Sequence, residues 1–196
     1  MSKSLKYLSL ALVLIAAGVG AFALGGLLRP QPAPVGTALD NPVDVRGLDL
    51  VDQHGSTVDL AGDFGGDVTL VFFGFTRCPD VCPMTMARLE KAYVDAGEPA
   101  DLKVVMVSVD PEFDTPEVMG AYVGRFHQDF VGLTGSTSQV AKAARTFFAG
   151  YSGTDASIVH TDAVAVVDRH GQLRYVYTAD AVVGIGSDLP GLLKRL

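Results

Sequence analysis

Beyond about residue 42, strand-like apolar segments alternate with segments in which apolar residues recur every three or four positions, as in helices. The strand-like segments are residues 48–51, 57–60, 70–75, 104–109, 163–167 and 173–177, and the helix-like segments are 83–96, 116–126, 138–148 and 189–196. The first two strands flank a turn and predict a hairpin. Residues 70–75 are continuously apolar, as expected of a central strand covered on both faces. This order predicts an α/β domain.

The start of the chain is different, because residues 7–28 contain no charged side chain. As a helix this run would be about 33 Å long, which matches a hydrocarbon core of about 30 Å. Lys3 and Lys6 precede it and favour a cytoplasmic N-terminus. We therefore expect a membrane anchor over 1–29, a proline-rich stalk over 30–41 and a folded domain over 42–196. The domain would lie on the extra-cytoplasmic side of a single-pass membrane protein.

A signal sequence is the alternative interpretation of this run. Ala21, Phe22 and Ala23 have the small-x-small pattern of a cleavage site. The apolar stretch is longer than the roughly 7 to 15 residues usual in signal peptides, which favours an uncleaved anchor. Both interpretations export the domain.

The charge of the exported part narrows the possible functions. Removing residues 1–29 takes away three basic residues and leaves 12 basic against 22 acidic ones, a net charge of −10. Nucleic-acid binding depends on basic patches, so the balance argues against it. An acidic surface suits metal cations or a basic partner.

Only two cysteines occur, Cys78 and Cys82, and they follow the apolar segment 70–75 directly. A disulfide closing so short a loop gains little stability, so the pair is placed for chemistry. Pro83 fits the first helical position, which would make Cys82 the N-cap and bring both sulfurs to one point at a helix N-terminus. Thiolates select Cu(I), and an added imidazole lets a site also hold Cu(II). Structural zinc fits less well, since it usually takes four protein ligands.

Four histidines could supply the imidazole. His54 and His170 each precede glycine in an expected turn, and His127 ends an expected helix. His160 comes just before the 163–167 strand and follows a glycine-containing segment, so it could swing onto a metal near the cysteines. The pattern favours His160 without excluding the others.

Three segments resemble the Sco/SenC family: residues 71–83 (VFFGFTRCPDVCP), residues 108–116 (SVDPEFDTP) with GLTG at 132–135, and His160-Thr161 ahead of an apolar strand. The resemblance covers about residues 45–178. It implies a thioredoxin-like domain with an N-terminal hairpin, here preceded by a single transmembrane helix. It also implies a copper site, Cu(I) or Cu(II), formed by Cys78, Cys82 and His160. Family members commonly have Asp before this histidine, whereas this chain has Val159.

The resemblance further implies a part in assembling the binuclear copper centre of cytochrome c oxidase. Expected partners are the copper-bearing oxidase subunit and another periplasmic copper chaperone or a thiol reductant. A metallochaperone is the first hypothesis. A thiol–disulfide oxidoreductase, in which Cys78 and Cys82 form a redox-active pair that reduces a copper-receiving partner, is the second, and a peroxidase-like or redox-sensing protein is the third. Asp110 is interpreted as a turn-forming residue or as one that tunes the copper site.

Overall fold

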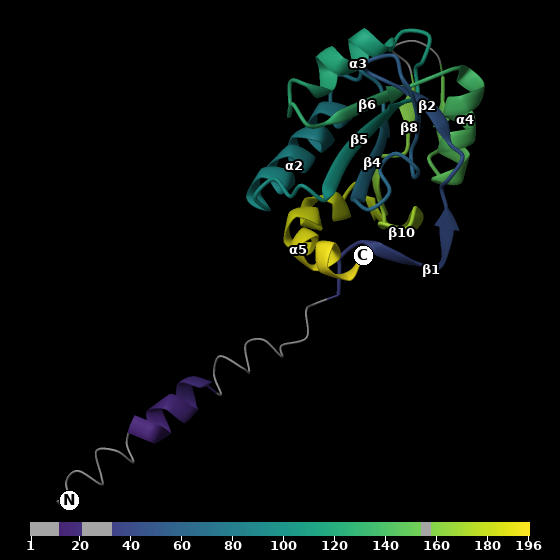
Figure 1. Ribbon diagram of the computed structural model, residues 1–196. Coiled ribbons are helices and arrows are strands. Elements are labelled where there is room, and N and C mark those ends of the chain that lie inside the picture. Colours follow the sequence, from purple (N-terminus) through teal and green to yellow (C-terminus); the bar gives the residue numbers. More distant parts are fainter. Residues whose placement is uncertain (1–11, 21–32, 154–157) are drawn as a thin grey trace, which may run out of the picture. The chain divides into compact units, whose positions relative to one another are not determined.

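The computed structural model describes residues 12–20, 33–153 and 158–196 (Figure 1). Residues 12–20 are helical, and the rest of the described chain from Pro34 onward is one compact unit. Within the described residues, no helix has the length and apolar character needed to cross a bilayer. Most of the expected 7–28 anchor lies outside those residues, so the anchor stays a prediction.

An eight-stranded mixed sheet forms the centre of the compact unit, with the strand order β1-β10-β9-β4-β5-β6-β2-β3. β4, β5 and β6 are parallel, whereas β9 pairs antiparallel with β4, and β2 pairs antiparallel with β6. Its strands are β1 (Thr37–Asp44), β2 (Asp49–Asp52), β3 (Thr57–Asp59), β4 (Val68–Gly74), β5 (Leu102–Ser108), β6 (Val131–Thr134), β9 (Ala163–Val167) and β10 (Gln172–Thr178). The predicted hairpin is confirmed as β2 and β3.

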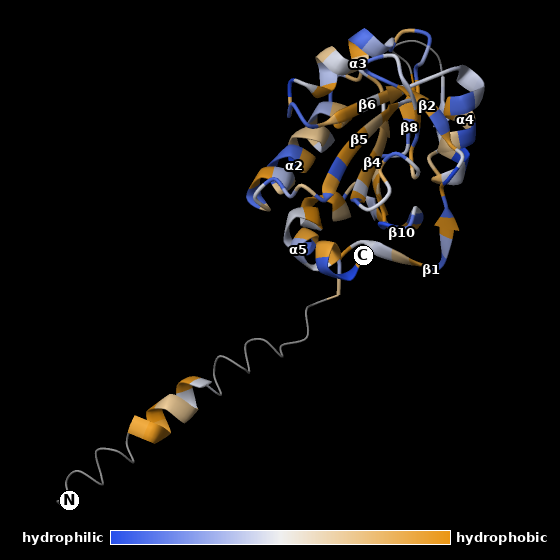
Figure 2. Cartoon of the chain, viewed as in Figure 1, coloured by the Kyte–Doolittle hydropathy of each residue, from blue (hydrophilic) through white to orange (hydrophobic). Residues whose placement is uncertain are grey.

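Helices cover both faces of the sheet. They are α2 (Val81–Asp95), α3 (Pro116–Val123), α4 (Thr137–Thr146) and α5 (Ile185–Arg195), with a 3-10 turn η2 at Ala181–Gly184. All seven residues of β4 are buried, as its continuous apolar sequence predicts. Figure 1 shows α2 and α5 on one side of the central strands and α4 on the other. Figure 2 shows the hydrophobic residues concentrated in those strands, with hydrophilic residues on the outer surfaces of the helices.

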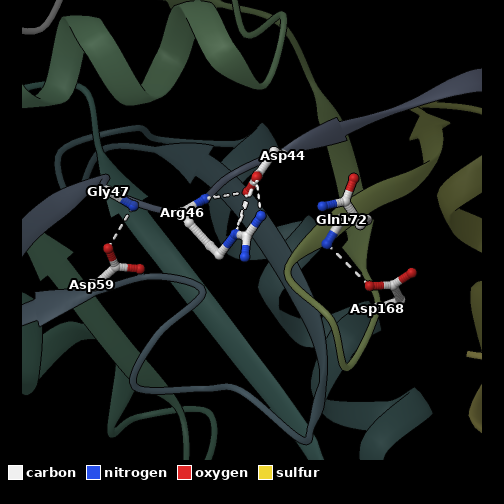
Figure 3. Close-up of polar contacts among 6 residues, drawn as sticks. All are labelled: Asp44, Arg46, Gly47, Asp59, Asp168 and Gln172. Atoms are coloured by element: carbon white, nitrogen blue, oxygen red, sulfur yellow. Dashed lines mark hydrogen bonds and ion pairs between the residues drawn. The ribbon is translucent and has the colours of Figure 1, made fainter.

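Aspartates fix the turns at one end of the sheet (Figure 3). The buried Asp168 accepts hydrogen bonds through Oδ1 from the backbone N–H groups of His170 and Gln172, which closes the predicted turn between β9 and β10. Asp44 pairs with Arg46 where β1 ends, and Asp59 accepts from the N–H of Gly47. These hydrogen bonds connect the ends of the strands to the adjoining turns.

The pattern of apolar residues did not indicate β1, and this strand overlaps the end of the expected 30–41 stalk. Its sequence, TALDNPVD, is half polar and mostly exposed, and it contains Pro42. Such residues are tolerated on an edge strand, and β1 pairs only with β10, through a register irregularity. Within the compact unit, regular structure therefore begins at Thr37.

Candidate metal centre

The two cysteines lie where β4 passes into α2. Both are free thiols; Cys82 is fully buried and Cys78 is half-buried. Gly74, the last residue of β4, allows this approach, since a Cβ at that position would lie 3.0 Å from Cys82 Sγ and 2.7 Å from the Phe72 ring. The absence of a side chain at Gly74 thus lets the Cys82 sulfur rest against the strand.

The expected start of this helix was wrong by two residues. α2 begins at Val81, with Asp80 as the N-cap, so Cys82 lies inside the first turn and Pro83 follows it. Proline is tolerated there because the first-turn N–H groups have no partner within the helix. As a result the Cys82 N–H is free to donate to Cys78 Sγ, 3.5 Å away. The helix N-terminus thus faces the Cys78 sulfur.

His160 approaches the cysteines from a strand that lies outside the eight-stranded sheet. It belongs to the two-residue strand β8 (Val159–His160), which pairs with β7 (Tyr151–Ser152). Its Nε2 lies 3.1 Å from Cys82 Sγ, and its Nδ1 lies 3.2 Å from the Thr161 carbonyl oxygen. A carbonyl can only accept, so Nδ1 carries the proton and the Nε2 lone pair faces the sulfur.

Aromatic rings hold the imidazole of His160 in this orientation. The rings of Phe72 and Phe75 each meet it edge to face, with centroids 5.8 Å away. One ligand atom from each of Cys78, Cys82 and His160 lies within 4.8 Å of the others. The structure therefore brings together the three residues expected to bind the metal, and their role as ligands stays a prediction.

The other histidines lie elsewhere. His54 and His170 are exposed in turns that Asp52 and Asp168 stabilise through backbone N–H groups. His127 forms a second cluster with Glu98 and Asp129, in which the three ligand atoms lie within 4.8 Å.

Sequence analysis did not find this second cluster, because Glu98 is far from His127 in the chain. The N–H of Asp129 donates to His127 Nδ1 over 3.2 Å, so a backbone hydrogen bond occupies one of the two ring nitrogens. The cysteine–histidine cluster instead offers two sulfur atoms and one imidazole nitrogen.

The two thiols are electrostatically unequal. Burial raises the pKa of the Cys82 thiol far above its ordinary value, and the nearby Cys78 and Asp162 add to the effect. Burial alone would also raise the pKa of Cys78. Hydrogen bonds from the backbone N–H groups of Cys82, Asp80 and Val81 outweigh it and bring that pKa below its ordinary value.

This inequality predicts selective alkylation of the reduced protein. The Cys78 thiolate forms at lower pH than an ordinary thiol, whose pKa is about 8.5, so Cys78 should react with iodoacetamide first and at a pH below that value. Cys82 should stay unmodified until the protein unfolds. Mass spectrometry of the alkylated peptide across a pH series measures both. Equal labelling of the two cysteines in the native protein would contradict the assignment, and equal labelling in denaturant is the control.

A buried carboxylate supports the loop before Cys78. Asp114, fully buried, accepts from the Thr76 N–H over 3.1 Å and from the hydroxyl groups of Thr76 and Ser108 over 2.5 and 2.6 Å. It therefore ties the end of β5 to the residues that follow β4.

Asp110 accepts from the Arg77 guanidinium, which also lies over the Phe113 ring at 4.1 Å. The carbonyl of Asp110 accepts the N–H groups of Phe113 and Asp114, as its interpretation as a turn residue requires. Its carboxylate positions Arg77, the neighbour of Cys78.

We expect Asp114→Ala to lower the free energy of unfolding by about 3 kcal/mol or more, because it leaves three donors without their acceptor. Urea denaturation followed by circular dichroism measures this. Asp95→Ala, which removes only an exposed pair with Lys91, is the control and should leave the transition nearly unmoved. Similar transitions for both variants would show that Asp114 does not hold the loop.

Comparison with known proteins places this arrangement in context. The SCO1/SenC family model matches residues 42–182. An SCO2-like protein of Rickettsia felis is 30% identical over 173 residues, which cover 82% of this chain and 84% of that protein.

Two solved structures share the fold. Apo Sco1 of Thermus thermophilus is 38% identical, with a TM-score of 0.68, and the match covers 82% of this chain and 99% of that one. Bradyrhizobium japonicum ScoI, solved with copper bound, is 29% identical, with a TM-score of 0.66 and coverage of 78% and 98%. These likenesses confirm the expected α/β, thioredoxin-like domain.

Proposed function

Because this chain belongs to the SCO1/SenC family, we propose that it binds copper through Cys78, Cys82 and His160 and delivers it to the binuclear copper centre of cytochrome c oxidase. The observation that carries the proposal is the convergence of two thiols and one imidazole within 4.8 Å. The copper-bearing oxidase subunit is the partner that this function requires, and another periplasmic copper chaperone or a thiol reductant would act before it.

The chemistry of the donor set fits copper. Two thiolates suit Cu(I), and an imidazole whose Nε2 lone pair faces them extends the site to Cu(II). Structural zinc would need a fourth protein ligand, and the described chain gathers three donors here. The rings of Phe72 and Phe75 and the Thr161 carbonyl hold the His160 imidazole in place, as outer-shell partners of metal-binding histidines do.

The unequal exposure of the three expected ligands suits transfer of the metal to a partner. Cys78 and His160 are half-buried, whereas Cys82 is fully buried in the first turn of α2. A ligand group of the partner can therefore approach the ion at Cys78 and His160 while Cys82 still holds it. If the ligands are exchanged one at a time in this way, the metal passes to the partner without being released to water.

The experiment is titration of the reduced protein with Cu(I) under a competing chelator, compared with His160→Ala and with His170→Ala as the control. We expect one tight equivalent for the wild type and for His170→Ala. His160→Ala should bind at least about tenfold more weakly, because loss of an outer-shell partner alone costs that much. Wild-type affinity in His160→Ala would refute the three-ligand site.

A thiol–disulfide oxidoreductase is the second candidate, and the unequal thiols favour it. A half-exposed Cys78 of lowered pKa can attack a partner disulfide, and the buried Cys82 can then resolve the mixed disulfide. The partner gains two thiols as Cys78 and Cys82 join. In Cys82→Ser, a stable mixed disulfide with the copper-receiving subunit would favour this function, and its absence would favour metal delivery alone.

For localisation, we propose a single-pass anchor over residues 7–28 with the domain outside the cytoplasm. The charge-free run and the two lysines before it support this proposal. Retention of the protein in membranes after an alkaline wash tests the anchor, and release of a shortened protein would indicate a cleaved signal sequence.

A further inference from the structure

Hydrogen bonds hold the segment around His160 from two sides. On one side, the N–H and the hydroxyl of Thr161 donate to the carbonyl of Gly150 over 2.8 and 3.3 Å. On the other side, Asp162 Oδ1 accepts a hydrogen bond of 3.0 Å from the hydroxyl of Thr85. The second contact joins residues that are 77 positions apart in the chain.

The Thr85–Asp162 contact links the two halves of the metal centre. Thr85 is fully buried on α2, three residues after Cys82, and residues with this spacing share one face of a helix. Asp162 comes two residues after His160 and immediately before β9. A single hydrogen bond thus fastens the strand that presents the imidazole to the helix that presents the buried thiol.

We propose that Thr85 and Asp162 are positioning residues that hold His160 against Cys82 before the metal arrives. The inference rests on the proposed copper function and adds to it the device that preorganises its third ligand. β8 pairs with the two-residue β7 and Thr161 bonds Gly150 beside β7, so these contacts tie the His160 segment to its neighbour and not to α2. With Asp162 fastened to α2, the cost of ordering the His160 segment is met on folding rather than on binding.

The sequence around His160 agrees with this assignment. Val159, the residue before His160, is 70% exposed and has no polar side-chain atom. The acid of this segment is Asp162, on the other side of the histidine, and its Oδ1 accepts the hydrogen bond from the Thr85 hydroxyl. The Asp162 side chain therefore faces α2, whereas Val159 faces solvent.

A purely structural role is the competing explanation, since any hydrogen bond to a buried hydroxyl stabilises the fold. The two explanations differ in whether Thr85 acts through His160. If it does, removing the hydroxyl and removing the imidazole are not additive in copper affinity. If Thr85 only stabilises the fold, the two effects add.

The test compares Thr85→Val, which removes the hydroxyl at nearly constant volume, with Thr85→Ser, which keeps it. We expect Thr85→Val to weaken Cu(I) binding about tenfold and Thr85→Ser to bind as the wild type does. In the His160→Ala background, Thr85→Val should have no further effect. Cu(II)-loaded Thr85→Val should lose the imidazole nitrogen hyperfine coupling in electron paramagnetic resonance. Wild-type affinity in Thr85→Val, or additive effects in the double variant, would overturn the inference.

A metal-free measurement separates this inference from the copper proposal. The ring currents of Phe72 and Phe75 should shift the NMR resonances of the His160 imidazole protons, because both rings meet the imidazole edge to face. These resonances should move toward free-histidine values in metal-free Thr85→Val but not in Thr85→Ser. Unchanged resonances would refute the positioning role whether or not copper binds. Absence of copper binding in the wild type, with the resonance change present, would refute the copper proposal alone. Should Thr85→Val fail to fold, Asp162→Ala against Asp162→Asn, which keeps the acceptor, gives the same comparison.

Discussion

Replacing Cys82 by serine should abolish tight copper binding, with a loss of more than about a hundredfold in affinity. That figure is the upper end of the cost of removing an outer-shell partner, and loss of a ligand exceeds it. Cys82 is the fully buried donor that contacts His160 Nε2 at 3.1 Å, so serine removes the atom at the middle of the cluster. A hydroxyl is a poor replacement because Cu(I) prefers sulfur. Competition with a Cu(I) chelator measures the loss.

Met84→Ala is the matched control for this variant. Met84 carries another sulfur near the start of α2, and the residue is 47% exposed. Its removal should leave the affinity unchanged if Cys78, Cys82 and His160 hold the ion. Comparable losses in both variants would move the metal to another place on α2.

Oxidation of the cysteine pair should remove copper binding altogether. Cysteine binds copper as its thiolate, so a disulfide between Cys78 and Cys82 eliminates two of three donors in one step. The remaining imidazole of His160 is not sufficient, and its neighbours Val159 and Thr161 add no strong ligand. We expect one equivalent in the reduced protein and none in the oxidised protein, by titration with Cu(I) and Cu(II) separately.

Treatment of the oxidised protein with a reductant is the control for this experiment, and it should restore the full equivalent. Equal binding by the oxidised and reduced forms would place the metal away from the cysteines. It would also leave the oxidoreductase as the better account of the pair.

The main elements could be predicted because their signals are local. β4 and β5 are rich in apolar residues, and the segment that follows β4 leads into α2, so the placement of both cysteines at a strand–helix junction follows from the sequence. β1 could not be predicted, because its exposed polar residues are held by pairing with β10 rather than by a pattern of their own.

The metal centre was predictable to a different degree at each residue. The spacing of Cys78 and Cys82 indicated a shared metal, whereas the sequence pattern only favoured His160 among four histidines until the family resemblance singled it out. The Thr85–Asp162 contact had only weak signals: an acid next to an apolar strand and a threonine one helical turn after Cys82. Contacts over such long sequence separations appear only once the fold is known.

X-ray absorption at the copper edge of the reduced, copper-loaded protein tests the central claim most directly. The account predicts a first shell of two sulfur donors and one imidazole nitrogen, with the nitrogen lost in His160→Ala and one sulfur lost in Cys78→Ser. A shell of oxygen and nitrogen donors alone, or one that the two substitutions leave unchanged, would contradict copper binding by Cys78, Cys82 and His160.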